Sequence, residues 1–169
     1  AVPGGTVVVT TGLLRALDGP DELAAVLAHE AAHVRLRHPG RGLMAQLSAG
    51  LLLSLIAGDG SALSQTLQVA GQLGTLSYSR ADETAADRAA AAMLKAAGIS
   101  PRSLAKALDS IGRRERTGPG VSFLSTHPAP AERRARIERL ASGAELENAG
   151  PIVEPAAWAG MVAALPEGN

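Results

Sequence analysis

Apolar residues recur at helical spacing along most of the 169-residue chain, and glycine or proline separates the apolar segments. This pattern predicts a mainly helical protein. The one strong strand signal is the β-branched run from Thr6 to Thr10, which follows a Pro-Gly-Gly turn. We therefore expect an α+β fold that is mainly α with a small β element. The helices are expected at about residues 11–18, 20–38, 42–57, 61–77, 79–97, 101–115, 130–142 and 154–165.

The length fits a single domain, residues 1–169, with enough chain to bury a core. Alanine and leucine dominate, and only Phe123, Tyr78 and Trp158 are aromatic, so the core must consist of closely packed helices with small side chains. The 16 basic and 16 acidic residues balance, which argues against nucleic acid as a partner. Cysteine is absent, so any metal ligands must be His, Asp or Glu.

The chain begins at Ala1 and lacks the features of a signal peptide, and we expect that sequence upstream of it has been removed. The most apolar stretch, Leu43 to Ala57, has about fifteen residues and includes a glutamine, whereas a membrane-spanning helix needs roughly 20. This stretch predicts a buried or interfacial helix rather than a membrane span.

Three of the four histidines lie in one segment, "AHEAAHVRLRH", from Ala28 to His38. On a helix, His29 and His33 lie one turn apart on the same face, so both imidazoles can bind one ion. Glu30 projects beside them and is placed to take a proton from a metal-bound water, as in H-E-x-x-H zinc hydrolases. The alternative is a chance match, in which the histidines only cap or solvate a helix.

A third ligand must come from another part of the chain. The metzincin pattern is excluded because Leu36 and Pro39 occupy its glycine and third histidine positions. His38 is rotated about 140° around the helix from His33, so it cannot easily reach the same ion. We expect His38 to contact the carbonyl end of the helix or a neighbouring segment.

The segment "YSRADETAADRAA" offers carboxylates on a separate helix. Glu83 and Asp87 are four residues apart and share a face. Glu83 can therefore bind the metal while Asp87 accepts a hydrogen bond from the other nitrogen of a ligand histidine. The alternative is that both carboxylates are solvent-facing charges on an alanine-rich helix.

The segments "HEAAHVRLRH", "SYSRADETAAD" and "LSTHPAPAERR" resemble, in this order, three signatures of a gluzincin metallopeptidase family. This family includes bacterial HtpX, periplasmic BepA-type proteases and the CAAX prenyl endopeptidases. The resemblance spans residues 1 to about 137 and implies a zincin-like domain. It implies that one Zn²⁺ is bound by His29, His33 and Glu83. It also implies that Glu30 is the general base and that Asp87 supports a ligand histidine.

The resemblance further suggests that His127, in the "STHP" loop, approaches the metal. His127 would either stabilise the oxyanion or fill the open metal position in a resting state. The alternative is a turn residue held by Pro128. Arg133 is expected to anchor this loop through a salt bridge.

The implied function is a zinc-dependent endopeptidase that cuts unfolded or extended protein segments through a metal-activated water, with Thr6–Thr10 at the rim of the cleft. A latent, metal-stabilised scaffold or chaperone-like domain in envelope protein quality control is the competing class. Because no pair of membrane spans is present, the chain is nearest to the soluble BepA-like type. We therefore expect the bacterial periplasm or cell envelope, with peripheral membrane association as an option. The oligomeric state stays open.

Overall fold

The computed structural model describes residues 1–2, 4–57, 78–117, 123–128, 131–142 and 152–166. Eight helices lie in these ranges, and the described residues contain no strand. The prediction of a mainly helical protein is therefore confirmed. The helices are α1 (Thr11–Ala16), α2 (Pro20–Arg35), α3 (His38–Ala57), α5 (Arg80–Ala96), α6 (Arg102–Thr117), α7 (Phe123–Thr126), α8 (Ala131–Ala141) and α9 (Pro155–Ala163).

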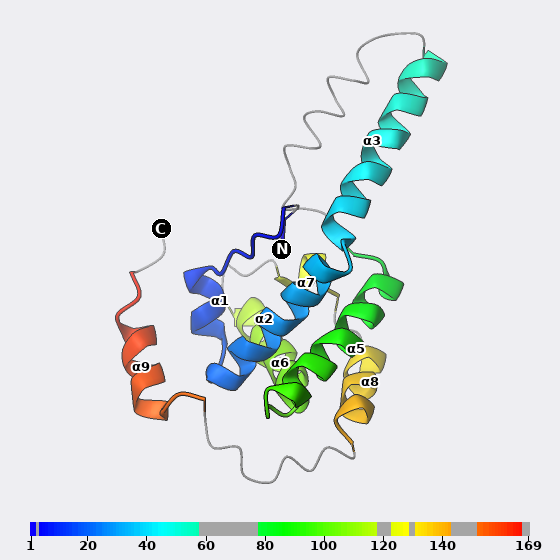
Figure 1. Cartoon of the computed structure of the whole chain (residues 1–169). Coiled ribbons are helices and arrows are strands. Elements are labelled where there is room, and N and C mark those ends of the chain that lie inside the picture. The colour runs from blue at the N-terminus through cyan, green and yellow to red at the C-terminus, as the bar shows by residue number, and fades with distance from the viewer. Residues whose placement is uncertain (3, 58–77, 118–122, 129–130, 143–151, 167–169) are drawn as a thin grey trace.

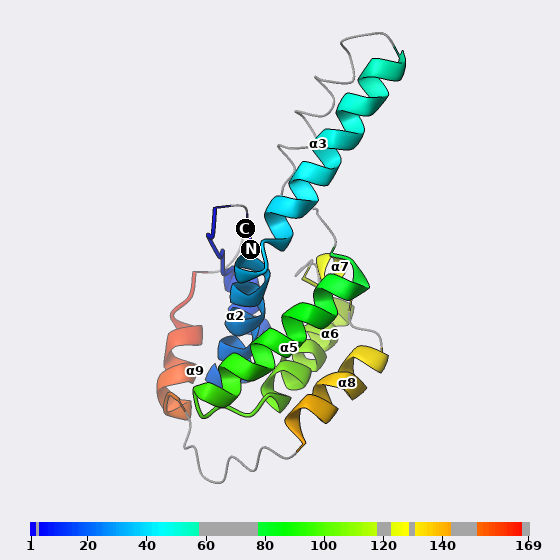
Figure 2. The same cartoon turned by 45° about the vertical axis from the view of Figure 1, so that its right-hand side comes forward.

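Helices α2 and α5 pack against each other at the centre, and α6 and α8 pack against this pair (Figures 1 and 2). Small side chains allow the close approach, because Ala25 and Ala32 on α2 and Ala86 and Ala90 on α5 are fully buried. These same two helices carry the H-E-x-x-H segment and the predicted glutamate. Their packing therefore decides whether the candidate ligands meet.

Two clusters of larger side chains fill the space around the central pair. One joins α1, α2, α6 and α9 through residues that include Leu13, Val26, Ile111 and Trp158. The other joins α2, α5, α6 and α8 and includes Leu94, Leu104, Leu108 and Ile137. Each cluster excludes water from one side of α2, which fixes the rotation of this helix about its axis.

Helix α2 ends at Arg35, three residues before its predicted end at His38. Arg37 adopts a left-handed conformation with φ of 57°, and this breaks the helix. Helix α3 then starts at His38 with Pro39 in its first turn, where a missing N–H removes no helical hydrogen bond. The chain changes direction here, and α3 extends away from the other helices in both views (Figures 1 and 2).

The strand predicted at Thr6–Thr10 does not form, and this prediction is wrong for these residues. A strand needs a partner for its N–H and C=O groups, and the described part of the chain contains no strand that could pair with it. The side chain of Thr10 instead caps α1 by accepting a hydrogen bond of 3.1 Å from the N–H of Leu13. Val8 is 68% exposed, so this β-branched run contributes little to the core.

The helices predicted over 79–97, 101–115, 130–142 and 154–165 are confirmed to within about three residues at each end. The helix predicted over 61–77 lies outside the described residues. The short helix α7 was not expected, because its segment reads as a glycine-containing loop. Among the described helices, none has the length and apolar character needed to cross a membrane.

Candidate metal centre

The fold brings every residue singled out in the sequence to one buried place. Helix α2 supplies two histidines and a glutamate, and α5 supplies two carboxylates one turn apart. The segment after α7 supplies a histidine, and α8 supplies an arginine. All of these side chains are buried: His29, Glu30, His33, Glu83, Asp87, His127 and Arg133.

The potential ligand atoms form a tight group. The Nε2 atoms of His29 and His33 are 3.0 Å apart. Glu83 lies against both, with Oε2 3.4 Å from His29 Nε2 and Oε1 3.2 Å from His33 Nε2. His127 completes the group, because its Nδ1 is 3.3 Å from His29 Nε2. One ligand atom from each of these four residues lies within 4.8 Å of all the others.

This spacing fits a tetrahedral zinc ion. With zinc–ligand bonds of about 2.0–2.1 Å, neighbouring ligand atoms of a tetrahedron are about 3.3–3.4 Å apart. The separations of 3.0 to 3.4 Å between the candidate atoms are close to that value. Glu83 Oε2 is also buried without a well-angled hydrogen bond, although an Arg133 nitrogen lies 2.6 Å away. The imidazole and carboxylate atoms that are present therefore suit Zn²⁺.

The start of α5 explains where Glu83 lies. Ser79 and Asp82 form a capping box, in which Ser79 Oγ accepts a hydrogen bond of 3.1 Å from the N–H of Asp82. The Asp82 carboxylate accepts one of 3.3 Å in return from the N–H of Ser79. Glu83 follows directly in the first turn. Burial alone would raise the pKa of Glu83, but the close contacts of its carboxylate with the imidazoles of His127, His29 and His33 hold this pKa well below its usual range.

Glu30 lies beside the group without belonging to it. Its Oε1 is 3.2 Å from His127 Nε2, and its Oε2 contacts the amino group of Ala1. Burial alone would raise the pKa of Glu30, but the neighbouring imidazole of His127 holds the pKa below its ordinary value. Glu30 is therefore a carboxylate at neutral pH and can accept a proton.

Asp87 stands behind His29, on the side away from the other candidate ligands. Its Oδ1 is 3.2 Å from His29 Nδ1. Arg133 binds the same carboxylate with two nitrogens, Nε to Oδ2 at 3.0 Å and Nη2 to Oδ1 at 2.9 Å, and Arg136 adds a contact of 3.2 Å. Burial alone would raise the pKa of Asp87, but hydrogen bonds with His29 and Arg133 lower this pKa. The carboxylate is thus charged and held in one orientation.

Arg133 also ties the His127 segment to the rest of the site. Its Nη1 donates to the carbonyl oxygens of His127 at 3.3 Å and Pro128 at 3.1 Å. Phe123 stacks on the His127 ring, with centroids 4.5 Å apart and an angle of 18° between the planes. The imidazole of His127 is therefore held at both its backbone and its ring face.

Sequence reasoning missed Tyr78 and the contact of His38 with His33. The Tyr78 ring packs on His33 with centroids 3.9 Å apart, and burial raises the pKa of Tyr78 to about 12. As a single aromatic residue before a helix, Tyr78 leaves no periodic signal in the sequence. His38 is outside the ligand group, as predicted, but its Nδ1 lies 3.0 Å from Nδ1 of His33.

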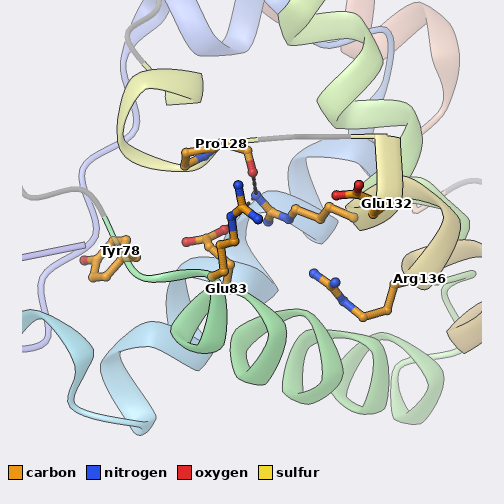
Figure 3. Close-up of a pocket in the computed structure, with 7 residues that line it drawn as sticks. Tyr78, Glu83, Pro128, Glu132 and Arg136 are labelled. Carbon is orange, nitrogen blue, oxygen red and sulfur yellow. Dashed lines mark hydrogen bonds and ion pairs between the residues drawn. The ribbon is translucent and has the colours of Figure 1, made fainter.

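A cavity of about 310 Å³ adjoins the candidate ligands (Figure 3). Glu83 on α5 forms part of its wall, and Glu132 and Arg136 reach toward it from α8. It therefore opens next to the group of imidazoles. Its lining residues are Tyr78, Arg80, Glu83, Pro128, Glu132, Arg133 and Arg136.

An H-E-x-x-H helix that meets a glutamate from a second helix is the arrangement of the gluzincin class of metallopeptidases. Comparison with protein families agrees, because the pattern of peptidase family M48 matches residues 1–141. The chain belongs to peptidase family M48. The resemblance noted in the sequence is thereby confirmed.

Individual relatives extend this result. The chain is 32% identical to the beta-barrel assembly-enhancing protease of Yersinia pestis over 143 residues, which cover 77% of this chain and 29% of that protein. It is 31% identical to the metalloprotease LoiP of Escherichia coli over 144 residues, or 81% and 56% of the two chains. It is 30% identical to the mitochondrial metalloendopeptidase OMA1 of Schizosaccharomyces pombe over 156 residues, or 87% and 44%. The chain thus spans between about a third and just over half of the length of these relatives.

Proposed function

We propose that this protein is a zinc-dependent endopeptidase that hydrolyses peptide bonds in unfolded or extended protein segments. One observation carries the proposal: nitrogen and oxygen atoms of His29, His33 and Glu83 lie 3.0 to 3.4 Å apart in a buried group, with the Glu30 carboxylate beside it. Membership of peptidase family M48 and the names of the relatives support it.

In this proposal His29, His33 and Glu83 hold one Zn²⁺, which when bound polarises the scissile carbonyl and acidifies a water molecule. Glu30 takes the proton of that water and passes it to the leaving amine. Its depressed pKa keeps Glu30 ionised at neutral pH, as a base must be. Its burial also keeps bulk water from competing for the proton.

Three further residues support this chemistry. Asp87 lies 3.2 Å from Nδ1 of His29, where its carboxylate would receive the proton of that nitrogen and direct Nε2 of the ring to the metal. Arg133 holds Asp87 and, through two carbonyl oxygens, the loop of His127. His127 either stabilises the oxyanion or fills the open position on the metal in a resting state.

The substrate is a protein or peptide whose backbone lies across the ligand group. The adjoining cavity of about 310 Å³ has room for one of its side chains. Because this cavity shares Glu83 with the candidate ligands, a substrate carbonyl near the metal would have its neighbouring side chain there. An extended segment can present both groups at once, whereas a folded helix or sheet cannot.

The test combines metal analysis with cleavage of casein, an unfolded protein. We expect about one zinc per chain, and loss of zinc in Glu83→Ala. Glu30→Gln should retain zinc and lose cleavage almost completely, because its amide cannot accept the proton. If the chain acts instead as a metal-stabilised scaffold, its binding of unfolded protein survives Glu30→Gln and the wild type cleaves nothing. Full zinc occupancy in Glu83→Ala would contradict the ligand assignment.

We also propose a bacterial periplasmic or envelope location with peripheral membrane contact. The name of the Yersinia relative refers to beta-barrel assembly. Helix α3 extends away from the other helices, its run from Leu43 to Ala57 has no charged residue, and Met44 is 62% exposed. In a density gradient the protein should float with phosphatidylcholine vesicles. Met44→Glu should reduce the fraction of protein that floats. Met161→Glu, on α9, is the matched control and should have no effect. A wild-type protein that stays at the bottom of the gradient would contradict membrane contact.

A further inference from the structure

We propose that His38 is a positioning residue for His33, and that Asp82 in turn orients His38. This inference rests on the proposed metal site. The two candidate ligand histidines would then be oriented by different groups, His29 by a carboxylate and His33 by a second imidazole.

The distances support a continuous chain of contacts. His33 presents Nε2 to Glu83 and His29, and its other nitrogen, Nδ1, lies 3.0 Å from Nδ1 of His38. The remaining nitrogen of His38, Nε2, is 3.4 Å from Asp82 Oδ1. Behind His29, Asp87 is found at the corresponding place, 3.2 Å from Nδ1. Each ligand histidine therefore has one polar partner at the nitrogen that faces away from the metal.

Hydrogen-bond chemistry gives this series of contacts, from His33 through His38 to Asp82, a direction. A metal takes the lone pair of His33 Nε2, so the proton of that ring must lie on Nδ1, from which it is donated to His38 Nδ1. His38 then carries its own proton on Nε2, facing the Asp82 carboxylate. In the opposite arrangement His33 would aim a proton at the metal, and His38 would aim a lone pair at Asp82. The carboxylate therefore selects the arrangement in which His33 is a ligand.

The local fold holds both supporting residues in place. The left-handed Arg37 and the new helix at His38 turn the chain, so that the His38 ring lies against the last turn of α2. His38 is buried, at 4% exposure. Asp82 belongs to the capping box of α5, and Arg41 lies 3.5 Å from its Oδ1. The partner of His33 is thus supplied by the segment that joins α2 to α3 and is supported by α5.

The experiment measures zinc dissociation constants by competition with a chelator, together with the thermal stability of the metal-free proteins. His38→Ala should weaken zinc binding by about 10- to 100-fold, as loss of an orienting partner typically does. His38→Asn should recover most of the affinity, because its Oδ1 can accept the His33 proton from nearly the position of Nδ1. His38→Gln, one methylene longer, places its oxygen elsewhere and should stay weak.

The Asn and Gln variants form the decisive pair, since both are polar and differ by one methylene. A purely structural role of His38 would change the stability of the metal-free proteins without this difference in zinc affinity. Thr10→Ala is the control: it removes the side-chain cap of α1, a helix that carries no residue of the site, so it should lower the melting temperature and leave zinc affinity unchanged.

Equal zinc affinity of wild type and His38→Ala would overturn the inference, and so would equal affinity of the Asn and Gln variants. These results are distinct from failure of the proposed function, in which the wild-type chain itself binds no zinc or Glu83→Ala keeps full occupancy.

Discussion

His127 lies between two carboxylates that have different proposed roles. Its Nδ1 is 3.0 Å from Glu83 Oε1, and its Nε2 is 3.2 Å from Glu30 Oε1. Burial lowers the pKa of His127, which favours a neutral ring with a free lone pair. The separation of 3.3 Å between His127 Nδ1 and His29 Nε2 is also the spacing of neighbouring zinc ligands. This geometry favours the resting-state role, in which His127 occupies the position that the nucleophilic water needs.

The corresponding prediction is that His127→Ala raises the rate of casein cleavage and leaves zinc bound, because three protein ligands remain. Steady-state rates and zinc content of the purified variant test it. A fall of roughly 10²–10³-fold would instead indicate an oxyanion stabiliser. An unchanged rate would return His127 to the turn-residue interpretation.

At the scale of elements, the site depends on the small spacing between α2 and α5. Ala25 on α2 and Ala90 on α5 are both fully buried in the same cluster. Glu83 and Asp87 lie on the same face of α5 as Ala90, so the spacing that these alanines permit also sets the reach of the carboxylates to the histidines.

We therefore expect Ala90→Leu to lower the free energy of unfolding by about 1–3 kcal/mol, because the larger side chain overpacks the interface. It should also weaken zinc binding, because it separates α5 from α2. Urea unfolding and chelator competition measure the two effects. Ala92→Leu, at an exposed position of α5, is the control and should change stability by less than about 0.5 kcal/mol. Unchanged stability of Ala90→Leu would contradict this, because it would show that the interface between α2 and α5 accommodates the larger side chain without strain.

The parts of the fold that depend on local spacing could be predicted from the sequence. The pairs His29/His33 and Glu83/Asp87 are each separated by one helical turn, so each pair could be placed on one helix face. The strand at Thr6–Thr10 was wrong because β-branched residues favour a strand only where a partner exists.

The contact between His38 and His33 was missed for a different reason. It requires the helix to break at Arg37, and a left-handed arginine leaves no signal in the hydrophobic pattern. Tyr78 was missed because a single aromatic residue before a helix has no spacing to interpret.

At the scale of the whole molecule, one buried side chain links the parts that form the site. Arg133 on α8 bonds Asp87 on α5, lies 2.6 Å from Glu83, and donates to the carbonyl oxygens of His127 and Pro128. The carboxylates of Glu83 and Asp87 thus share a positive charge that the chain itself supplies. Zinc fingers lack such support and unfold when their metal is removed.

We predict that chelator treatment at neutral pH leaves the protein helical and cooperatively folded. Acid should then lower the melting temperature of the metal-free protein. The folded protein holds the pKa values of Glu83 and Asp87 below their ordinary values of about 4. Above about pH 4 both carboxylates therefore contribute fully to the free energy of unfolding. This contribution is lost as the pH falls through their folded-state pKa values. Circular dichroism melts between pH 7 and pH 3 test this. Loss of the helical signal on chelation at pH 7 would contradict it.

The guanidinium of Arg133 has a consequence for the life of the protein in a cell. In many small metalloproteins, folding and metal binding occur together. An internal counter-ion that maintains the shape of the site allows folding to precede metal binding. Under the proposed function, such a chain would fold first and become active when zinc is delivered. The supply of metal, as well as the rate of synthesis, would then set how much active protein the cell contains.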